Sequence, residues 1–217
     1  MDENLSVKLR TALNGLLAKY EPLFRKVAKK ATKRMIDRTL KYSSVALGQS
    51  LKQVSEQWTL KVDYLTTPRM QEVITAATTE AANLIRLIPQ KYLGDVQGQV
   101  MRSITTGDGL KDLVPYLREK YDGNVRHARL VAVDQTGKAL SNINAARMIE
   151  IGQTKYIWLH TGGSKEPRKT HIAMNGKEYD LLDPPVIGVM YGQEVRGKPR
   201  DVPGCRCLMR PILNFKE

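Results

Sequence analysis

Apolar residues in the first quarter of the chain recur with the period of an α-helix. Between residues 21 and 51, one face carries Phe24, Ala28, Ala31 and Met35. Glu21 and Pro22 fit the start of this helix, because an acid complements the helix dipole there and a proline needs no N–H bond in the first turn. We therefore predict a long amphipathic helix that begins near Pro22.

The next pattern predicts two helices between residues 67 and 107. Each has a proline near its first turn, Pro68 in one and Pro89 in the other. Thr67 fits the N-cap of the first helix, and Gly107 fits the end of the second. The preceding stretch QWTLKVDYL is rich in β-branched and aromatic residues, so helix, short strand and extended linker all stay open there.

Helical periodicity continues to about residue 152. The stretch DGLKDLVPYLREKYDG predicts a short helix between Asp108 and Gly123. The run that follows places small and apolar residues on one side, with Gly137 as an expected break and Gly152 as an expected C-cap. A helical body therefore fills roughly the first two thirds of the chain.

The pattern changes after Gln153. The segment KYIWLHT alternates as a strand does, and MNGKEYDL contains an Asn-Gly pair of the kind that makes tight hairpin turns. Six of the 10 prolines lie beyond Gly162. We predict an α+β fold, with a mainly helical N-terminal body followed by a small β-rich C-terminal unit.

Charge points to a polyanionic partner. The chain has a formal net charge of +13, and residues 1–41 hold 11 basic and 4 acidic side chains. A basic segment of this kind suggests that the protein lies close to nucleic acid or to an acidic protein face. A solvated basic surface without a specific partner also stays open. The candidate phosphate contacts lie on the first predicted helix: Lys26, Lys29, Lys30, Lys33 and Arg34. We find no membrane-spanning run and no signal-peptide pattern, so a cytoplasmic origin is expected.

Histidine and cysteine gather near the C-terminus. Two of the three histidines, His160 and His171, and both cysteines, Cys205 and Cys207, lie in the last third of the chain. A disulfide across one residue is strained, so the cysteines are expected to be free thiols or metal ligands. The turn-rich segment after Trp158 predicts that the chain reverses, and the PGCRC segment is expected to pair with a partner strand that satisfies its backbone. Together these features predict that His171 lies beside both sulfurs.

Three interpretations of this cluster stay open: a zinc site, a packed structural cluster and a catalytic site. Thiolate and imidazole ligands suit zinc, with His160 as a fourth ligand, but the thiols could also pack as small apolar groups while His171 bonds the turn. A nucleophilic enzyme would instead use Cys205 or Cys207 with His171 as base and Asp183 or Asp201 as orienting acid.

The motifs in the second half of the chain occur in a characteristic order. RLVAVDQTGKALSNINAARMIEIGQTKYIWLHTGG is followed by PRKTHIAMNGKEYDL, DPP and PGCRCLMRP. This order resembles the Mu F-like head morphogenesis family, the minor capsid proteins of tailed bacteriophages. The matching positions are Arg129, Asp134, Gln135, Asn144, Ala145, Gly152, Trp158, Arg168, His171, Asn175, Gly176, Pro184, Pro203, Cys205, Arg206, Cys207 and Pro211.

The resemblance implies a structural virion protein rather than an enzyme. It would have a helical region over residues 1–109 and a head morphogenesis domain over 110–217. Its expected partners are the portal protein, capsid or scaffold proteins and packaged DNA, and its expected places are the capsid interior or portal vertex and the host cytoplasm during assembly. The alternatives are a zinc-stabilised nucleic-acid-binding module and an enzyme or toxin domain.

Overall fold

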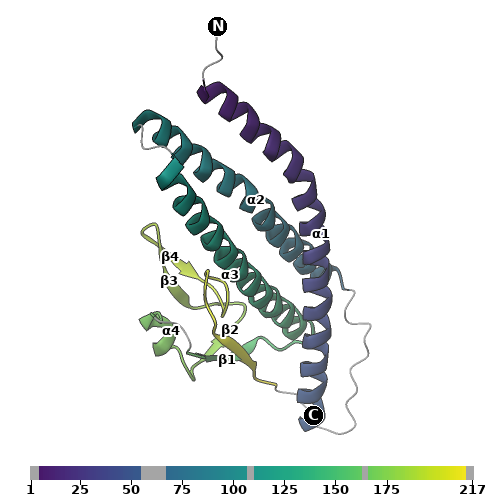
Figure 1. The fold of residues 1–217 in the computed structure, drawn as a ribbon. Helices are drawn as coiled ribbons and strands as arrows, with labels where there is room; N and C mark the ends of the chain where they lie inside the picture. Colours follow the sequence, from purple (N-terminus) through teal and green to yellow (C-terminus); the bar gives the residue numbers. More distant parts are fainter. Residues whose placement is uncertain (1–4, 55–66, 107–109, 163–165, 214–217) are drawn as a thin grey trace. The chain divides into compact units, whose positions relative to one another are not determined.

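The computed structural model describes residues 5–54, 67–106, 110–162 and 166–213. Three long helices are followed by a short helix and five strands (Figure 1). The helices are α1 (Leu5–Val54), α2 (Pro68–Thr106), α3 (Leu110–Glu150) and α4 (Lys169–Ala173); the strands are β1 (Lys155–Leu159), β2 (Glu178–Asp180), β3 (Val186–Met190), β4 (Gln193–Arg196) and β5 (Leu208–Pro211). The predicted α+β class is confirmed. Among the described residues, no helix combines the length and the hydrophobicity that crossing a membrane requires.

Several predicted helix boundaries are wrong. Pro22, Pro89 and Pro115 all lie inside continuous helices, so α1 begins well before Pro22, and the two helices expected at Pro68 and Pro89 are one. Gly123 and Gly137 likewise lie within α3 instead of ending a helix. A proline or glycine destabilises a helix only near its own position. The hydrogen bonds and packing of a helix of 39 to 50 residues outweigh that local loss of stability. The QWTLKVDYL stretch lies outside the described residues.

Other helix signals in the sequence are confirmed. Pro68 is the first residue of α2, and Thr67 caps it, because the Met70 N–H donates to Thr67 Oγ1 at 3.2 Å. At the end of α3, Gly152 N–H donates to Ile149 O at 3.0 Å, and Gln153 N–H donates to Met148 O at 2.8 Å. These two bonds form a Schellman motif, and Gly152 has the positive φ of 74° that the motif needs.

The buried face of α1 agrees only in part with the predicted one: Ala28 is buried and Met35 packs against a buried cluster. Ala31 is exposed, whereas Thr32, Thr39 and Ser43 are almost fully buried. Thr32 Oγ1 donates to Ala28 O, and Thr39 Oγ1 donates to Met35 O, each at 2.8 Å. Because the helix's own carbonyls satisfy these hydroxyls, the face can be buried without being apolar. A pattern of apolar positions could not reveal it.

The chain divides into two compact units, each containing parts of all three long helices. The first unit consists of Met1–Arg34 and Thr78–Ala132. Within it, Leu13, Ala28 and Ala81 are buried. Ion pairs on its surface join Glu21 to Arg86 at 3.8 Å and Asp95 to Lys120 at 3.5 Å. Small buried residues let its helices pack with few aromatic side chains.

The second unit consists of Met35–Ala77 and Val133–Glu217. Its helical part has two apolar clusters, one around Ile36, Ala77 and Ala139 and the other around Met70, Ile143 and Ala146. Between α1 and α3 lies a polar contact: the buried Arg147 guanidinium donates to Ser43 Oγ and to Ser44 Oγ. Ser43 Oγ in turn donates to Asn144 Oδ1 at 2.6 Å.

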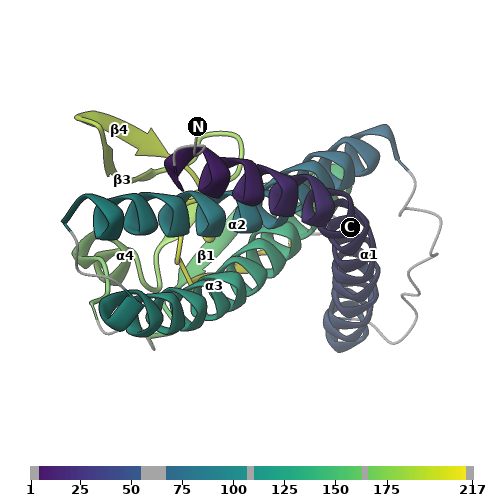
Figure 2. The ribbon, with the colours of Figure 1, turned by 45° about the horizontal axis from the view of Figure 1, so that its top comes forward.

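Two small antiparallel sheets complete the second unit. In the first, the strand order is β2-β1-β5, with Tyr156 opposite Tyr179 and Trp158 opposite Met209. In the second, β3 and β4 form a hairpin (Figure 2). The change to β structure after residue 152 is thus confirmed. Tyr156 and Trp158, two apart on β1, are both fully buried in the core of this region.

Two details of the predicted β unit are wrong. The Asn175–Gly176 turn joins α4 to β2 and is therefore not a hairpin turn, although Gly176 does adopt a positive φ of 79°. The expected strand pairing of PGCRC is absent from this described segment, because β5 begins only at Leu208. Both cysteines lie in the loop before β5, where loop bonds satisfy the backbone instead: Cys205 N–H donates to Val202 O at 3.2 Å.

Candidate functional site

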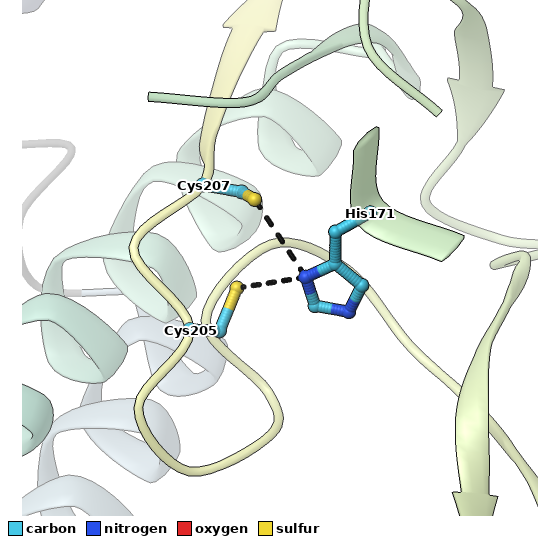
Figure 3. A group of neighbouring side chains, drawn as sticks. All are labelled: His171, Cys205 and Cys207. Atoms are coloured by element: carbon cyan, nitrogen blue, oxygen red, sulfur yellow. Dashed lines mark hydrogen bonds between the residues drawn. The ribbon is translucent and has the colours of Figure 1, made fainter. Parts of the chain in front are cut away.

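The histidine and cysteine side chains converge in the second unit. His171 lies on α4, and Cys205 and Cys207 lie on the loop that leads into β5. His171 Nδ1 is 3.6 Å from Cys205 Sγ and 3.7 Å from Cys207 Sγ (Figure 3). The predicted contact between His171 and both sulfurs is therefore confirmed. All three residues are buried, and both cysteines are free thiols.

Strand β1 provides the wall against which the cluster packs. The ring of Trp158 meets His171 edge to face, with 5.1 Å between centroids. His160 follows β1 directly, and its Nδ1 lies 3.5 Å from Cys207 Sγ. The His160 N–H donates to Asn175 Oδ1 at 2.8 Å, which fixes the backbone at this position. All four candidate ligands thus gather at one end of the three-stranded sheet.

Two backbone groups orient the cluster. His171 Nε2 lies 3.1 Å from the carbonyl oxygen of Ile187, so this nitrogen carries the proton and donates it. The Arg200 N–H donates to Cys205 Sγ at 3.4 Å. The other ring nitrogen, His171 Nδ1, faces the sulfurs.

The two thiols have opposite pKa shifts. A hydrogen bond from Cys207 and the N–H of Arg200 together outweigh burial and lower the pKa of Cys205 to about 5. The same bond to Cys205, together with burial, raises the pKa of the Cys207 thiol. Of the two thiols, Cys205 is therefore the one whose deprotonation the site favours.

A shallow pocket opens over the cluster. Its lining includes His160, Gly162, Glu166, Arg168 and Arg206 together with His171 and the cysteines. Arg168 Nη2 donates to Pro203 O at 2.9 Å, and Thr161 Oγ1 donates to Arg206 O at 2.9 Å. These bonds tie the loop that carries the cysteines to the segment that follows β1.

The carboxylates expected for a nucleophilic enzyme are engaged elsewhere. Asp201 pairs with Lys198 at 2.5 Å, and Asp183 pairs with Arg196 at 2.8 Å. His171 has the Ile187 carbonyl where that hypothesis needed an acid. The geometry resembles a ligand set more than a catalytic triad, in which the orienting group is a carboxylate.

The other positions of the family pattern lie in several environments. Trp158 is in the core, Asn144 accepts a hydrogen bond from Ser43, and Gly152 ends α3. Asp134 Oδ1 accepts a bond from the Gly204 N–H at 2.7 Å, which ties α3 to the turn before Cys205. Arg129 is exposed on α3. His127, the third histidine of the chain, is not part of the family pattern and is also exposed on α3.

The basic candidates lie apart in sequence, on α1 in the first unit. Lys26, Lys29, Lys30, Lys33 and Arg34 all have exposed side chains. Their exposure leaves them accessible to solvent.

The sequence pattern does not identify Ile187 and Arg200, whose backbone groups bond to the cluster. A backbone carbonyl or N–H carries no residue-type signal, so neither the Ile187 carbonyl nor the Arg200 N–H could be found from the pattern. Gly137 does give a signal, but by propensity that signal indicates a helix break and not a close approach of Arg200.

Comparison with known proteins agrees with these motifs. Residues 94–210 match the family described as Phage Mu protein F like protein. A curated relative from Haemophilus influenzae, described as an uncharacterized protein, is 28% identical over 150 residues, which cover 69% of this chain and 32% of that protein. The chain thus spans about a third of the length of that relative. No solved structure matches. Because the family match covers more than half of the chain and includes the whole His/Cys cluster, the chain belongs to the phage Mu protein F like family, the family of phage head proteins that its motifs indicate.

Proposed function

We propose that this protein is a structural minor head protein of a tailed bacteriophage and that it acts in head assembly at the portal vertex. The observation that carries the proposal is the family match over residues 94–210, which runs from the end of α2 through the β-rich region. Its partners are the portal protein and capsid or scaffold proteins. It resides in the host cytoplasm during assembly and then in the virion, at the capsid interior or portal vertex.

The test of this proposal uses phage particles. The gene is deleted from the phage or prophage, and heads are purified with and without complementation by the wild-type gene. We expect the complemented heads to contain the protein and the deletion to yield few DNA-filled heads. Normal DNA-filled heads from the deletion strain, together with absence of the protein from complemented heads, would overturn the proposal.

We further propose that α1 contacts packaged DNA through nonspecific charge. The exposed basic side chains of α1 support this, since neutralising phosphates releases counterions and strengthens binding at low salt. The log of the DNA affinity should therefore fall steeply with the log of the salt concentration, by about 0.9 per phosphate contact.

The DNA test compares two variants that lose the same charge. One replaces four exposed basic residues of α1 with glutamine: Lys26, Lys29, Lys30 and Arg34. The matched control replaces four exposed basic residues elsewhere: Lys91, Arg118, Arg126 and Lys177. We expect the first variant to lose more affinity and more salt dependence than the control. Equal losses of DNA affinity in the two variants would show that net charge governs binding and that the position of the basic side chains on α1 does not.

A further inference from the structure

The geometry points to a tetrahedral zinc site formed by His171, Cys205 and Cys207, with His160 as the fourth ligand. His171 binds through Nδ1, and each cysteine binds as a thiolate. This inference concerns what stabilises the β-rich region and does not depend on the head-assembly proposal.

The spacing of the three buried ligand atoms suits zinc. Zinc binds histidine nitrogen at about 2.0 to 2.1 Å and cysteine sulfur at about 2.3 Å, so tetrahedral geometry places nitrogen and sulfur about 3.6 Å apart. The two distances from His171 Nδ1 to the sulfurs are 3.6 and 3.7 Å. All three ligand atoms lie within 4.8 Å of one another. An ion can therefore occupy the centre with the backbone in place.

The groups around the ligands also suit a metal. Histidines that bind zinc usually donate their other ring N–H to a carbonyl or carboxylate, which fixes the tautomer. His171 does this through Nε2 to the Ile187 carbonyl at 3.1 Å. The Arg200 N–H, 3.4 Å from Cys205 Sγ, supports the charge of a bound thiolate.

His160 is the neighbour best placed to complete the tetrahedron. Its Nδ1 is already 3.5 Å from Cys207 Sγ, which is the separation expected of two ligands on one ion. The side chain is half-buried at the pocket over the cluster, so its ring has room to turn toward the centre. Glu166, which also lines that pocket, is the competing fourth ligand.

The experiment uses the full chain, prepared without metal and under reducing conditions. Cobalt(II) is titrated in, and absorbance reports thiolate-to-cobalt charge transfer and the intense visible bands of a tetrahedral ion. Zinc is then added to displace the cobalt, and elemental analysis gives the stoichiometry. We expect one ion per chain, a charge-transfer band from two thiolates, and protection of both cysteines from alkylation. Less than stoichiometric metal, or bound cobalt without thiolate bands, would overturn the site.

Three variants identify the fourth ligand. Loss of a group that merely supports a ligand commonly weakens metal binding about 10- to 100-fold, so His160→Ala should weaken it at least about tenfold. His127→Ala is the matched control, because His127 is exposed on α3 and should bind zinc as the wild type does. Glu166→Gln should also leave affinity unchanged. If Glu166→Gln weakens binding and His160→Ala does not, the assignment of His160 is overturned. The wild-type spectrum tests the three buried ligands even if Cys205→Ser or Cys207→Ser fails to fold.

Discussion

The guanidinium of Arg200 lies directly against Gly137, at a point of α3 where an added Cβ would come within 2.7 Å of Arg200 Nη1. Arg200 has a positive φ of 79°, and its N–H donates to Cys205 Sγ. Gly137 is thus one of the places on α3 where the loop that carries the cysteines approaches the helix. The glycine serves the close approach and does not end the helix.

Substituting Gly137 with alanine should therefore gain less stability than the same change elsewhere in α3. Alanine favours a helix over glycine by roughly 1 kcal/mol, but here the Cβ meets the guanidinium of Arg200, the far end of a flexible side chain that has to turn away. Gly123→Ala is the control in the same helix, since its Cβ would meet no atom closer than 3.9 Å. Urea unfolding should show a gain of about 1 kcal/mol for Gly123→Ala and a smaller gain or none for Gly137→Ala. If both variants gain equally, the Arg200 contact is unimportant.

Substituting Ser43 with alanine should destabilise the helical part of the second unit by about 2 kcal/mol. The change removes an acceptor from the buried Arg147 guanidinium and the donor to Asn144, and unpaired buried groups are costly. The double variant, Ser43→Ala with Arg147→Met, should lose less stability than the sum of the losses in the two single variants. The reason is that no buried guanidinium is then left without an acceptor. Urea unfolding of the four proteins measures this coupling. Additive costs would contradict it.

The burial of Tyr156 predicts that the folded protein loses stability at alkaline pH. Burial raises the pKa of the Tyr156 phenol, whose oxygen has no hydrogen-bond partner among the described residues. In the unfolded chain the phenol ionises near pH 10. The stabilising contribution is therefore complete below about pH 10 and is lost above it, by up to about 1.4 kcal/mol per pH unit.

The Tyr156→Phe variant isolates this effect. Phenylalanine keeps the ring and removes the unpaired hydroxyl, so the variant should be at least as stable as the wild type at pH 7 and should lose less stability between pH 10 and 11. Urea unfolding at pH 7, 10 and 11 provides the comparison. Parallel losses in the two proteins would show that Tyr156 does not titrate in the way that its burial requires.

Gly152→Ala should cost about 1 to 2 kcal/mol, because Gly152 holds a φ of 74° in the Schellman motif that ends α3. Gly152→Asn should cost less, since asparagine tolerates the left-handed conformation. Thermal unfolding ranks the three proteins. Equal costs for alanine and asparagine would point to a steric clash, although the structure shows nothing within 4 Å of a Cβ at this position.

The sequence determined the change from helix to strand after residue 152 and the presence of the cluster. Helical periodicity, the cap at Thr67, the stop at Gly152 and the alternation of β1 are local signals, and each depends on residues within a few positions of one another. The approach of His171 to both sulfurs was also predictable, because turn-forming residues lie between Trp158 and His171 and the two cysteines are two positions apart. The family followed from the order of these motifs.

Only the tertiary structure decided where a local signal would be overruled. Pro22, Pro89 and Gly137 are helix breakers by propensity, yet the packing and hydrogen bonds of long helices outweigh a penalty confined to one turn. Tertiary structure also decided that the hydroxyl face of α1 is buried and that His171 bonds to the Ile187 carbonyl. The first depends on which face of the helix is packed, and the second on where a distant backbone carbonyl comes to lie in space. Residue type along the chain encodes neither.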